Sequence, residues 1–376
     1  MSKKKIVRNL IFVVAILILL VVLVINLGDI KEIWSVLTNS KIGYIFLAIG
    51  AVLLYAFTYQ LSLMILTKYR FKEIKFIDLF AISGTEFFFN AITPFSSGGQ
   101  PFQAYALKRK KMKLADSTSA LLINFIAYQV CLNIIAVVFL IIYYNKVYNQ
   151  IDAFIAFLIV GFTINMLIMV GLILIGTVKP VGKIFLKLFH LITRIKFLRR
   201  FESGEAAFAE YINNMQIAFK EISKKPLLWF LILITKIISF GFYYAIPYIA
   251  LYAIGVHIKA IDLPYILALT AFTLTIAIWV PTPGGSGGVE YAFKELYSPF
   301  LETYGYDSST SVSMAFAVMM IWRLLTYYFL MFYGFVLYLI FEKRCKTNDK
   351  SIDTTDNDET RNNIVQETEI NDIIEE

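Results

Sequence analysis

Cysteine and histidine are almost absent from this sequence. There are two of each in 376 residues. Cys131 lies within a long apolar run, Cys345 follows the last such run, and His190 and His257 stand alone. The histidines do not fit the spacing of a metal site, and cysteines in such different settings do not indicate a disulfide framework. We therefore expect no bound metal and no cofactor.

Charged side chains are also scarce, at 16% of the chain, whereas 59% of the residues are hydrophobic. Soluble globular proteins average roughly 25% charged and about 45–50% apolar residues. The mean hydropathy is +0.69, and the apolar residues form long runs separated by short charged stretches. This composition excludes a soluble globular protein and predicts an all-α integral membrane protein.

The few charges are distributed unevenly. The net charge is +8, but residues 346–376 carry ten acidic and three basic side chains, which leaves +15 on residues 1–345. The basic residues border apolar runs instead of forming a soluble patch, which argues against nucleic-acid binding. We expect a polytopic membrane domain over residues 1–345. Residues 346–376 should form a disordered, acidic cytoplasmic tail because they contain few apolar side chains.

The N-terminus has three lysines followed by an apolar stretch from Ile6 to Leu27, which is similar to a signal peptide. The stretch is too long for that role, and no pair of small residues precedes Gly28 at the spacing of a cleavage site. We interpret it as a retained first helix.

Six runs are long enough to cross a bilayer core about 30 Å thick, which takes about 20 helical residues. They are Val7–Leu27, Ile42–Leu66, Thr118–Tyr144, Ile151–Val178, Leu227–Ile254 and Ser313–Phe341. Two further segments, Asp78–Thr93 and Leu263–Val280, are shorter and lead into turns rich in proline and glycine. The first of them would extend only about 24 Å as a helix.

The basic residues decide whether these short segments cross the membrane. If both crossed, the basic cluster Lys108–Lys113 and the long loop Lys179–Lys225 would lie outside, against the positive-inside rule. If each short helix turns back at mid-membrane, every basic loop falls in the cytoplasm. We therefore predict six full spans plus two re-entrant helical hairpins, with both termini in the cytoplasm.

This topology contains an inverted repeat. The first turn, Pro94-x-x-x-Gly98-Gly99, recurs as Pro283-x-x-x-Gly287-Gly288. Repeat one covers about residues 42–144 and repeat two about residues 227–341, and every direction is reversed between them. Broken helices that meet near the midplane are typical of the binding sites of secondary transporters.

The connector between the repeats, about residues 179–225, alternates apolar and basic residues. This pattern predicts one or two amphipathic helices on the cytoplasmic surface, held by anionic membrane lipids. The alternative is an ordinary connecting loop.

The two turns point helix N-termini, near Gly99 and Gly288, toward the midplane. Free N–H groups and the helix dipole favour an anion at such a position, which predicts a phosphate site. The alternative is that proline and glycine only break the helices for packing.

Charged residues within the apolar segments sharpen this hypothesis. Lys236 and Arg323 lie near the middle of their spans, where a cation costs about 2.5–3.5 kcal/mol, and Glu86 and Glu290 are the available ion-pair or proton partners. The alternative is a pair of static ion pairs. The predicted substrate-binding residues are Pro94, Gly98, Gly99, Gln100, Arg109, Lys236, Pro283, Gly284, Gly287, Gly288, Glu290 and Arg323. Asn90, Asn124, Gln129 and Asn133 could line the same cavity or join helices.

The segments Thr93–Arg109 and Pro281–Phe293 resemble the paired signatures of a known family. It is the flippase-like transmembrane region of lysylphosphatidylglycerol synthases, the multiple peptide resistance factors. The resemblance extends over about residues 5–341. It implies that the turn residues and one acidic residue are functional, here Pro94, Gly98, Gly99, Pro283, Gly284, Gly287, Gly288 and Glu290. Gln100 stands where many relatives have a second acid.

The resemblance also implies a role in moving lipid between leaflets of a bacterial cytoplasmic membrane, associated in the family with antibiotic resistance. We expect a stand-alone form without the soluble synthase domain. The expected substrate is an anionic or aminoacylated phospholipid, such as lysylphosphatidylglycerol, or a polyprenyl-phosphate-linked lipid. One alternative is phosphatidylglycerol lysyltransferase activity, and another is a membrane partner of a separate synthase.

Overall fold

The computed structural model describes residues 38–150, 155–194, 204–277, 282, 285 and 287–345. Two predicted elements lie outside these residues, namely the first span Val7–Leu27 and the acidic tail from residue 346 onward. Within the described ranges every regular element is a helix, as predicted.

Five long apolar helices within the described part of the chain are candidate membrane spans. They are α3 (Ile42–Arg70), α6 (Leu114–Gln150), α7 (Ile155–Thr177), α10 (Pro226–Ala253) and the helix Ser308–Cys345, which begins with α13 (Ser308–Arg323). Each corresponds to one of the predicted runs. Their outer surfaces carry exposed apolar side chains such as Ile141, Phe157 and Phe332. A helix suits this setting because it pairs its own backbone N–H and C=O groups, which lipid cannot do.

The first helical hairpin consists of α4 (Phe76–Ala91), the short turn Pro94–Ser96 and α5 (Gly99–Arg109). Its two ends meet, because Lys110 Nζ lies 3.3 Å from the Asp78 carboxylate. Arg344, at the end of the last span, donates to the same carboxylate at 2.5 Å. The open end of this hairpin is thus tied by charges to the C-terminal end of the helix Ser308–Cys345.

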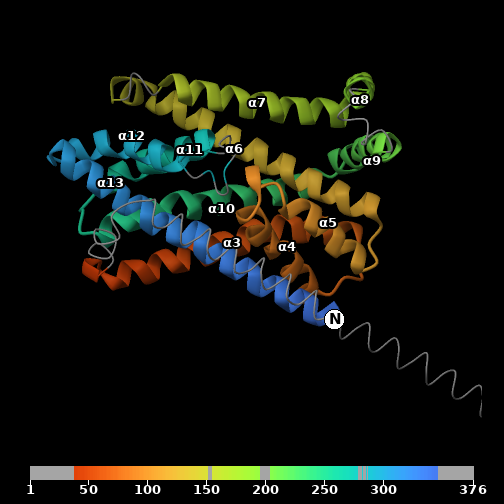
Figure 1. Cartoon of the computed structure of the whole chain (residues 1–376), viewed down its shortest axis with the longest axis horizontal. Coiled ribbons are helices and arrows are strands. Elements are labelled where there is room, and N and C mark those ends of the chain that lie inside the picture. The colour runs from red at the N-terminus through yellow and green to blue at the C-terminus, as the bar shows by residue number, and fades with distance from the viewer. Residues whose placement is uncertain are drawn as a thin grey trace, which may run out of the picture.

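The second helical hairpin consists of α11 (Leu263–Ala277) and α12 (Gly288–Glu302). Its ends also meet, because the Tyr304 hydroxyl donates to Asp262 at 2.6 Å. Lys146, near the end of α6, lies 3.6 Å from the same carboxylate, whereas α6 begins just after the first hairpin. The two hairpins therefore open toward opposite ends of α6, with α11 and α12 on the left of Figure 1 and α4 and α5 on the right.

Glycine lets α4 pack closely against the last span. A Cβ on Gly84 would overlap with Leu337 Cδ1, and one on Gly334 would lie 2.6 Å from the backbone nitrogen of Phe88. Small residues at helix crossings allow this approach, which gives van der Waals contact where lipid supplies no hydrophobic driving force. The contact holds the first hairpin beside the span that carries Arg323.

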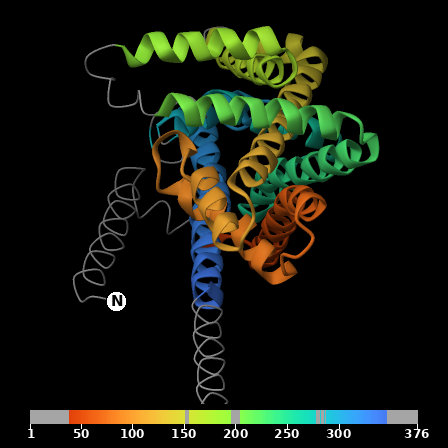
Figure 2. The ribbon, with the colours of Figure 1, turned by 90° about the vertical axis from the view of Figure 1, so that its right-hand side faces the viewer.

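Two amphipathic helices, α8 (Lys179–Thr193) and α9 (Glu205–Ser223), form much of the connector 179–225. Figure 1 views them nearly along their axes, and Figure 2 shows both lengthwise, crossing the direction of α7. The connector is thus helical in its described residues and lies across the spans.

Candidate functional site

The first turn is closed by two side chains of α4 and its C-terminal extension. The Gly98 N–H donates to Thr93 Oγ1 and the Gly99 N–H donates to Asn90 Oδ1, each at 2.8 Å. Phe95 and Ser96 have φ angles of 55° and 50°, a left-handed conformation that costs non-glycine residues about 1–2 kcal/mol each. Backbone strain of this kind is characteristic of functional sites.

Glycine is the only residue type that fits at positions 98 and 99 of this turn. A Cβ on Gly98 would lie 2.6 Å from Thr93 Cγ2, and one on Gly99 would lie 2.6 Å from Glu86 Cγ. The close approach of the returning chain to α4 therefore requires glycine at both predicted positions. It also places Glu86 directly beside the start of α5.

The second turn is closed by a carboxylate. Gly287 has a φ of 91°, and its N–H donates to Glu290 Oε2 at 2.6 Å, which caps α12. The other oxygen, Glu290 Oε1, accepts from Arg323 Nη2 at 2.8 Å. Glu290 and Arg323 are thus brought together as an almost buried ion pair, and Gly288 begins α12 beside them.

Three amides at the two turns are paired within the chain, whereas the sequence predicts N–H groups open to an anion near Gly99 and Gly288. The amides of Gly98 and Gly99 are paired with neutral side chains, and the amide of Gly287 is paired with the Glu290 carboxylate. The physical reason is that buried N–H groups need partners whether or not a ligand is bound. At the second turn a carboxylate of the chain itself pairs with the amide, where the sequence predicts a phosphate.

A cavity of about 220 Å³ lies between the two turns. Phe95 and Ser96 of the first turn and Thr282 and Gly285 of the second both contribute to its wall. Acidic and basic side chains share it, because Glu86 of α4 and Arg323 of α13 are among the lining residues. The remaining lining is Tyr55, Tyr59, Phe87, Asn90, Ala91, Tyr128, Tyr243, Leu274, Val289, Trp322, Thr326, Tyr327 and Leu330.

Tyr59 contacts both Lys236 and Glu86. The Lys236 side chain is fully buried; its Nζ lies 3.6 Å from the centre of the Tyr59 ring and donates to the Tyr59 carbonyl at 3.2 Å. The Tyr59 hydroxyl donates to Glu86 Oε1 at 3.0 Å. Cation–π contact lowers the cost of burying the ammonium group. Lys236 therefore lies behind the tyrosine, which presents its hydroxyl to the cavity carboxylate.

The helix is locally widened directly after Arg323. A π-helical turn covers Leu324–Phe329, and the Tyr327 hydroxyl donates from it to the carbonyl of Ala91 at 2.9 Å, close to the first turn. Thr326 and Tyr327 both line the cavity. Such π-bulges occur frequently at functional sites, and this one connects the last span to the turn of the first hairpin.

The other predicted site residues lie apart from the central cavity. Gln100 lines a second cavity of about 440 Å³, which shares Phe95 and Ser96 with the first. Arg109 lies at the open end of its hairpin and pairs with Glu342 at 2.8 Å. Pro94 begins the first turn, and Pro283 and Gly284 lie outside the described residues.

Of the four predicted amides, one lines the central cavity. Asn90 does so, whereas Asn124 accepts from Ser62 at 2.6 Å and Asn133 donates to the carbonyl of Gln129 at 2.8 Å. These last contacts join or stiffen helices, which is the structural alternative considered above.

The aromatic wall is the main feature that the sequence did not identify. Five tyrosines, two phenylalanines and Trp322 line the cavity. Aromatic residues make up 16% of the chain, so composition alone could not separate the cavity-facing rings from those facing lipid. The available signal was the position of Tyr55 and Tyr59 near the middle of a span, away from the interfacial belts where tyrosine is common.

The lysylphosphatidylglycerol synthase TM region is the family whose profile matches this chain, over residues 10–334. The match covers most of the sequence, so the chain belongs to this family and is an integral membrane protein. It is also similar to a UPF0104 membrane protein of Archaeoglobus fulgidus. The two are 24% identical over 308 residues, which are 80% of this chain and 87% of that protein.

Proposed function

We propose that the protein moves a lipid between membrane leaflets, with the lipid headgroup passing through the cavity between the two turns. The observation that carries this proposal is a single cavity bounded by both turns and lined by Arg323. Non-helical backbone at membrane depth is tolerated where protein buries it or where it lines a watery cavity. A lipid-related role also agrees with the family to which the chain belongs.

The size of the cavity favours a headgroup. Pockets that enclose a drug-sized ligand measure roughly 300–1,000 Å³, and this cavity is smaller, at about 220 Å³. The acyl chains would stay in the surrounding bilayer while the polar group crosses. This division of the lipid supports transport with the tails outside the protein.

The charges favour a phosphate-bearing headgroup. A guanidinium binds phosphate through paired hydrogen bonds, and the Arg323 guanidinium donates to an internal anion, the Glu290 carboxylate. Among the other lining residues of the same cavity, Glu86 and the tyrosines suit an ammonium group, through charge and cation–π attraction. We therefore propose an anionic or aminoacylated phospholipid, or a polyprenyl-phosphate-linked lipid, as the substrate.

We further propose that the two hairpins are re-entrant and inverted in a cytoplasmic membrane, with both chain termini in the cytoplasm. The opposite openings of the hairpins support this arrangement. A cysteine introduced as Lys108→Cys, at an exposed position near the open end of the first hairpin, should react with a membrane-impermeant reagent only from the cytoplasmic side. Labelling from outside would overturn the proposed topology.

Leaflet exchange in proteoliposomes tests the proposed function. The wild-type protein should exchange a fluorescent phospholipid between leaflets, and Arg323→Ala should abolish this exchange. Because the alanine variant leaves Glu290 buried without its partner, the double variant Arg323→Ala with Glu290→Gln serves as a second test. Lys259→Ala, an exposed cation outside the cavity, is the matched control. Unchanged exchange in both folded Arg323 variants would overturn the site assignment.

A further inference from the structure

The helix α8 has three distinct faces. Its inner face packs on α9, where Phe189 stacks on Phe208 with ring centres 4.5 Å apart and Thr193 donates to Glu205 at 2.6 Å. A second face is apolar and exposed, with Ile184 and Leu191 more than half accessible. Phe185 and Leu188 extend this apolar face. This apolar face is not covered by any other described part of the chain.

The third face is basic. Lys179, Lys183 and Lys187 are exposed and follow one another at intervals of four residues, which aligns them along one side of the helix. Consecutive residues are rotated by about 100° around a helix, so this lysine row flanks the apolar row of Ile184 and Leu188. The sequence of α8 contains no aspartate or glutamate. The outer surface of α8 therefore carries a cationic row of side chains beside an apolar row.

The position of α8 in the fold indicates what its outer surface contacts. The span α7 ends at Thr177 and α8 begins at Lys179, so α8 starts at the boundary where α7 leaves the bilayer. Figures 1 and 2 show that α8 then turns across the direction of α7. A helix that begins at this boundary and lies across the spans runs along the membrane surface.

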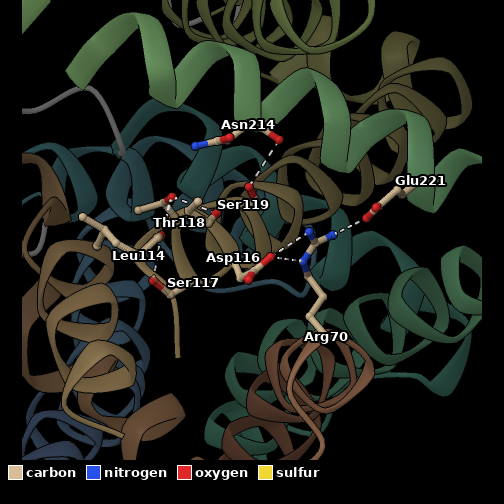
Figure 3. Close-up of polar contacts among 9 residues, drawn as sticks. Arg70, Leu114, Asp116, Ser117, Thr118, Ser119, Asn214 and Glu221 are labelled. Atoms are coloured by element: carbon tan, nitrogen blue, oxygen red, sulfur yellow. Dashed lines mark hydrogen bonds and ion pairs between the residues drawn. The ribbon is translucent and has the colours of Figure 1, made fainter. Parts of the chain in front are cut away.

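The α9 helix holds α8 in this place. Gln216 of α9 donates to the carbonyl of Ile175 in α7 at 2.8 Å, and Ser119 of α6 donates to the carbonyl of Asn214 at 3.4 Å. Figure 3 shows Arg70, at the end of α3, reaching both Asp116 of α6 and Glu221 of α9. These contacts fix α9 to three spans, so α8 is presented at a defined height and orientation.

We propose that the outer face of α8 binds the anionic lipid surface of the leaflet at which α7 ends. The apolar row enters the boundary between headgroups and acyl chains, and the lysine row lies at the level of the phosphates. Charge complementarity supports anionic lipid as the occupant, because surface lysines are attracted to the negative potential of such lipids. This binding is separate from the proposed transport and does not depend on which lipid is moved.

The test uses the full chain in lipid nanodiscs, with a fluorophore attached at Leu188→Cys. This labelling is selective because Cys131 and Cys345 are buried. Brominated acyl chains quench a fluorophore that reaches them, so brominated phosphatidylglycerol and brominated phosphatidylcholine report which lipid is near α8. We expect quenching by both lipids and a several-fold preference for phosphatidylglycerol.

The lysine row is tested by changing Lys183→Gln and Lys187→Gln together in the labelled protein. The preference for phosphatidylglycerol should be lost, whereas quenching by phosphatidylcholine should persist because the apolar row still inserts. Lys259→Gln, an exposed lysine in another loop, should leave the preference unchanged. Added inorganic phosphate should also leave it unchanged, because the site recognises a charged surface instead of a free ion.

Three results would overturn the proposal. If neither lipid quenches the fluorophore, α8 lies in water. Equal quenching by both lipids, in labelled protein that keeps all three lysines of α8, would show that the helix does not recognise lipid charge. Cross-linking of the Leu188→Cys position to a second copy of the chain, in place of quenching, would identify a protein as the occupant.

Discussion

The guanidinium of Arg323 lies 2.8 Å from the carboxylate of Glu290, and the same carboxylate caps the helix α12 through the amide of Gly287 at 2.6 Å. One anion thus bridges a mid-span cation and a helix N-terminus. Arg323 is the group that we propose for the phosphate of a lipid, and in this structure its partner is the Glu290 carboxylate. Under that proposal, a headgroup would exchange with Glu290 at Arg323.

The first prediction concerns the energy of this ion pair. Breaking a buried pair by removing one partner costs about 3–5 kcal/mol, because the remaining charge is left without compensation. We expect Arg323→Ala and Glu290→Ala each to lower the free energy of unfolding by about that amount. The double variant should lose much less than the two losses added together. Unfolding by denaturant in detergent micelles measures all four proteins, and additive losses would contradict the pairing.

Part of this site could be predicted from the sequence. Apolar runs identified the five candidate spans of the described residues, because a bilayer constrains segment length directly. Lys236 and Arg323 were recognisable as cations that need compensation within the membrane, with Glu86 and Glu290 as the available partners, but the sequence did not say which acid pairs with Arg323. The proline and glycine pattern marked both turns, because these residues break helices within apolar sequence.

Other parts depend on how the helices rotate against one another, which periodicity does not specify. The position of Tyr59 between Lys236 and Glu86 is of this kind, because it arises where helices far apart in sequence pack together. The Glu290 cap and the π-helical turn after Arg323 are local features, which the apolar pattern also did not indicate. Packing between distant segments also pairs Arg109 with Glu342, away from the central cavity, to which the sequence had assigned it.

The second prediction concerns the first turn. Gly99→Ala would place a Cβ 2.6 Å from Glu86 Cγ and 2.7 Å from Asn90 Oδ1, so either the carboxylate or the turn must move. Overpacking of this kind costs about 1–3 kcal/mol, and leaflet exchange should fall because the cavity wall is displaced. Gly50→Ala is the matched control, since nothing lies within 4 Å of its added methyl group. That change should stabilise α3 by roughly 0.5–1 kcal/mol and leave exchange intact.

The third prediction separates two roles of Tyr59. Tyr59→Phe keeps the ring beneath Lys236 but removes the hydroxyl that donates to Glu86. A hydrogen bond to a charged group contributes about 1.5–3 kcal/mol, so the midpoint of thermal unfolding should fall. Tyr59→Leu also removes the cation–π contact, worth roughly 2 kcal/mol when desolvated, and should lower the midpoint further. Equal midpoints for the two variants would show that the ring does not stabilise the buried ammonium group.

The fourth prediction concerns the clamp that fixes the connector. Arg70 donates to Asp116 from two nitrogens and to Glu221 from a third, as Figure 3 shows. A lysine has a single ammonium group and cannot reproduce this fork, so even Arg70→Lys should loosen α9. Because the pair with Glu221 is partly exposed and such pairs contribute about 0–1 kcal/mol, global stability should change little. Hydrogen exchange should instead accelerate in α9 and α8 while α10 keeps its protection. Lys72→Gln, an exposed neighbour outside the clamp, should leave both patterns unchanged, and an unaltered α9 in Arg70→Lys would contradict a clamping role.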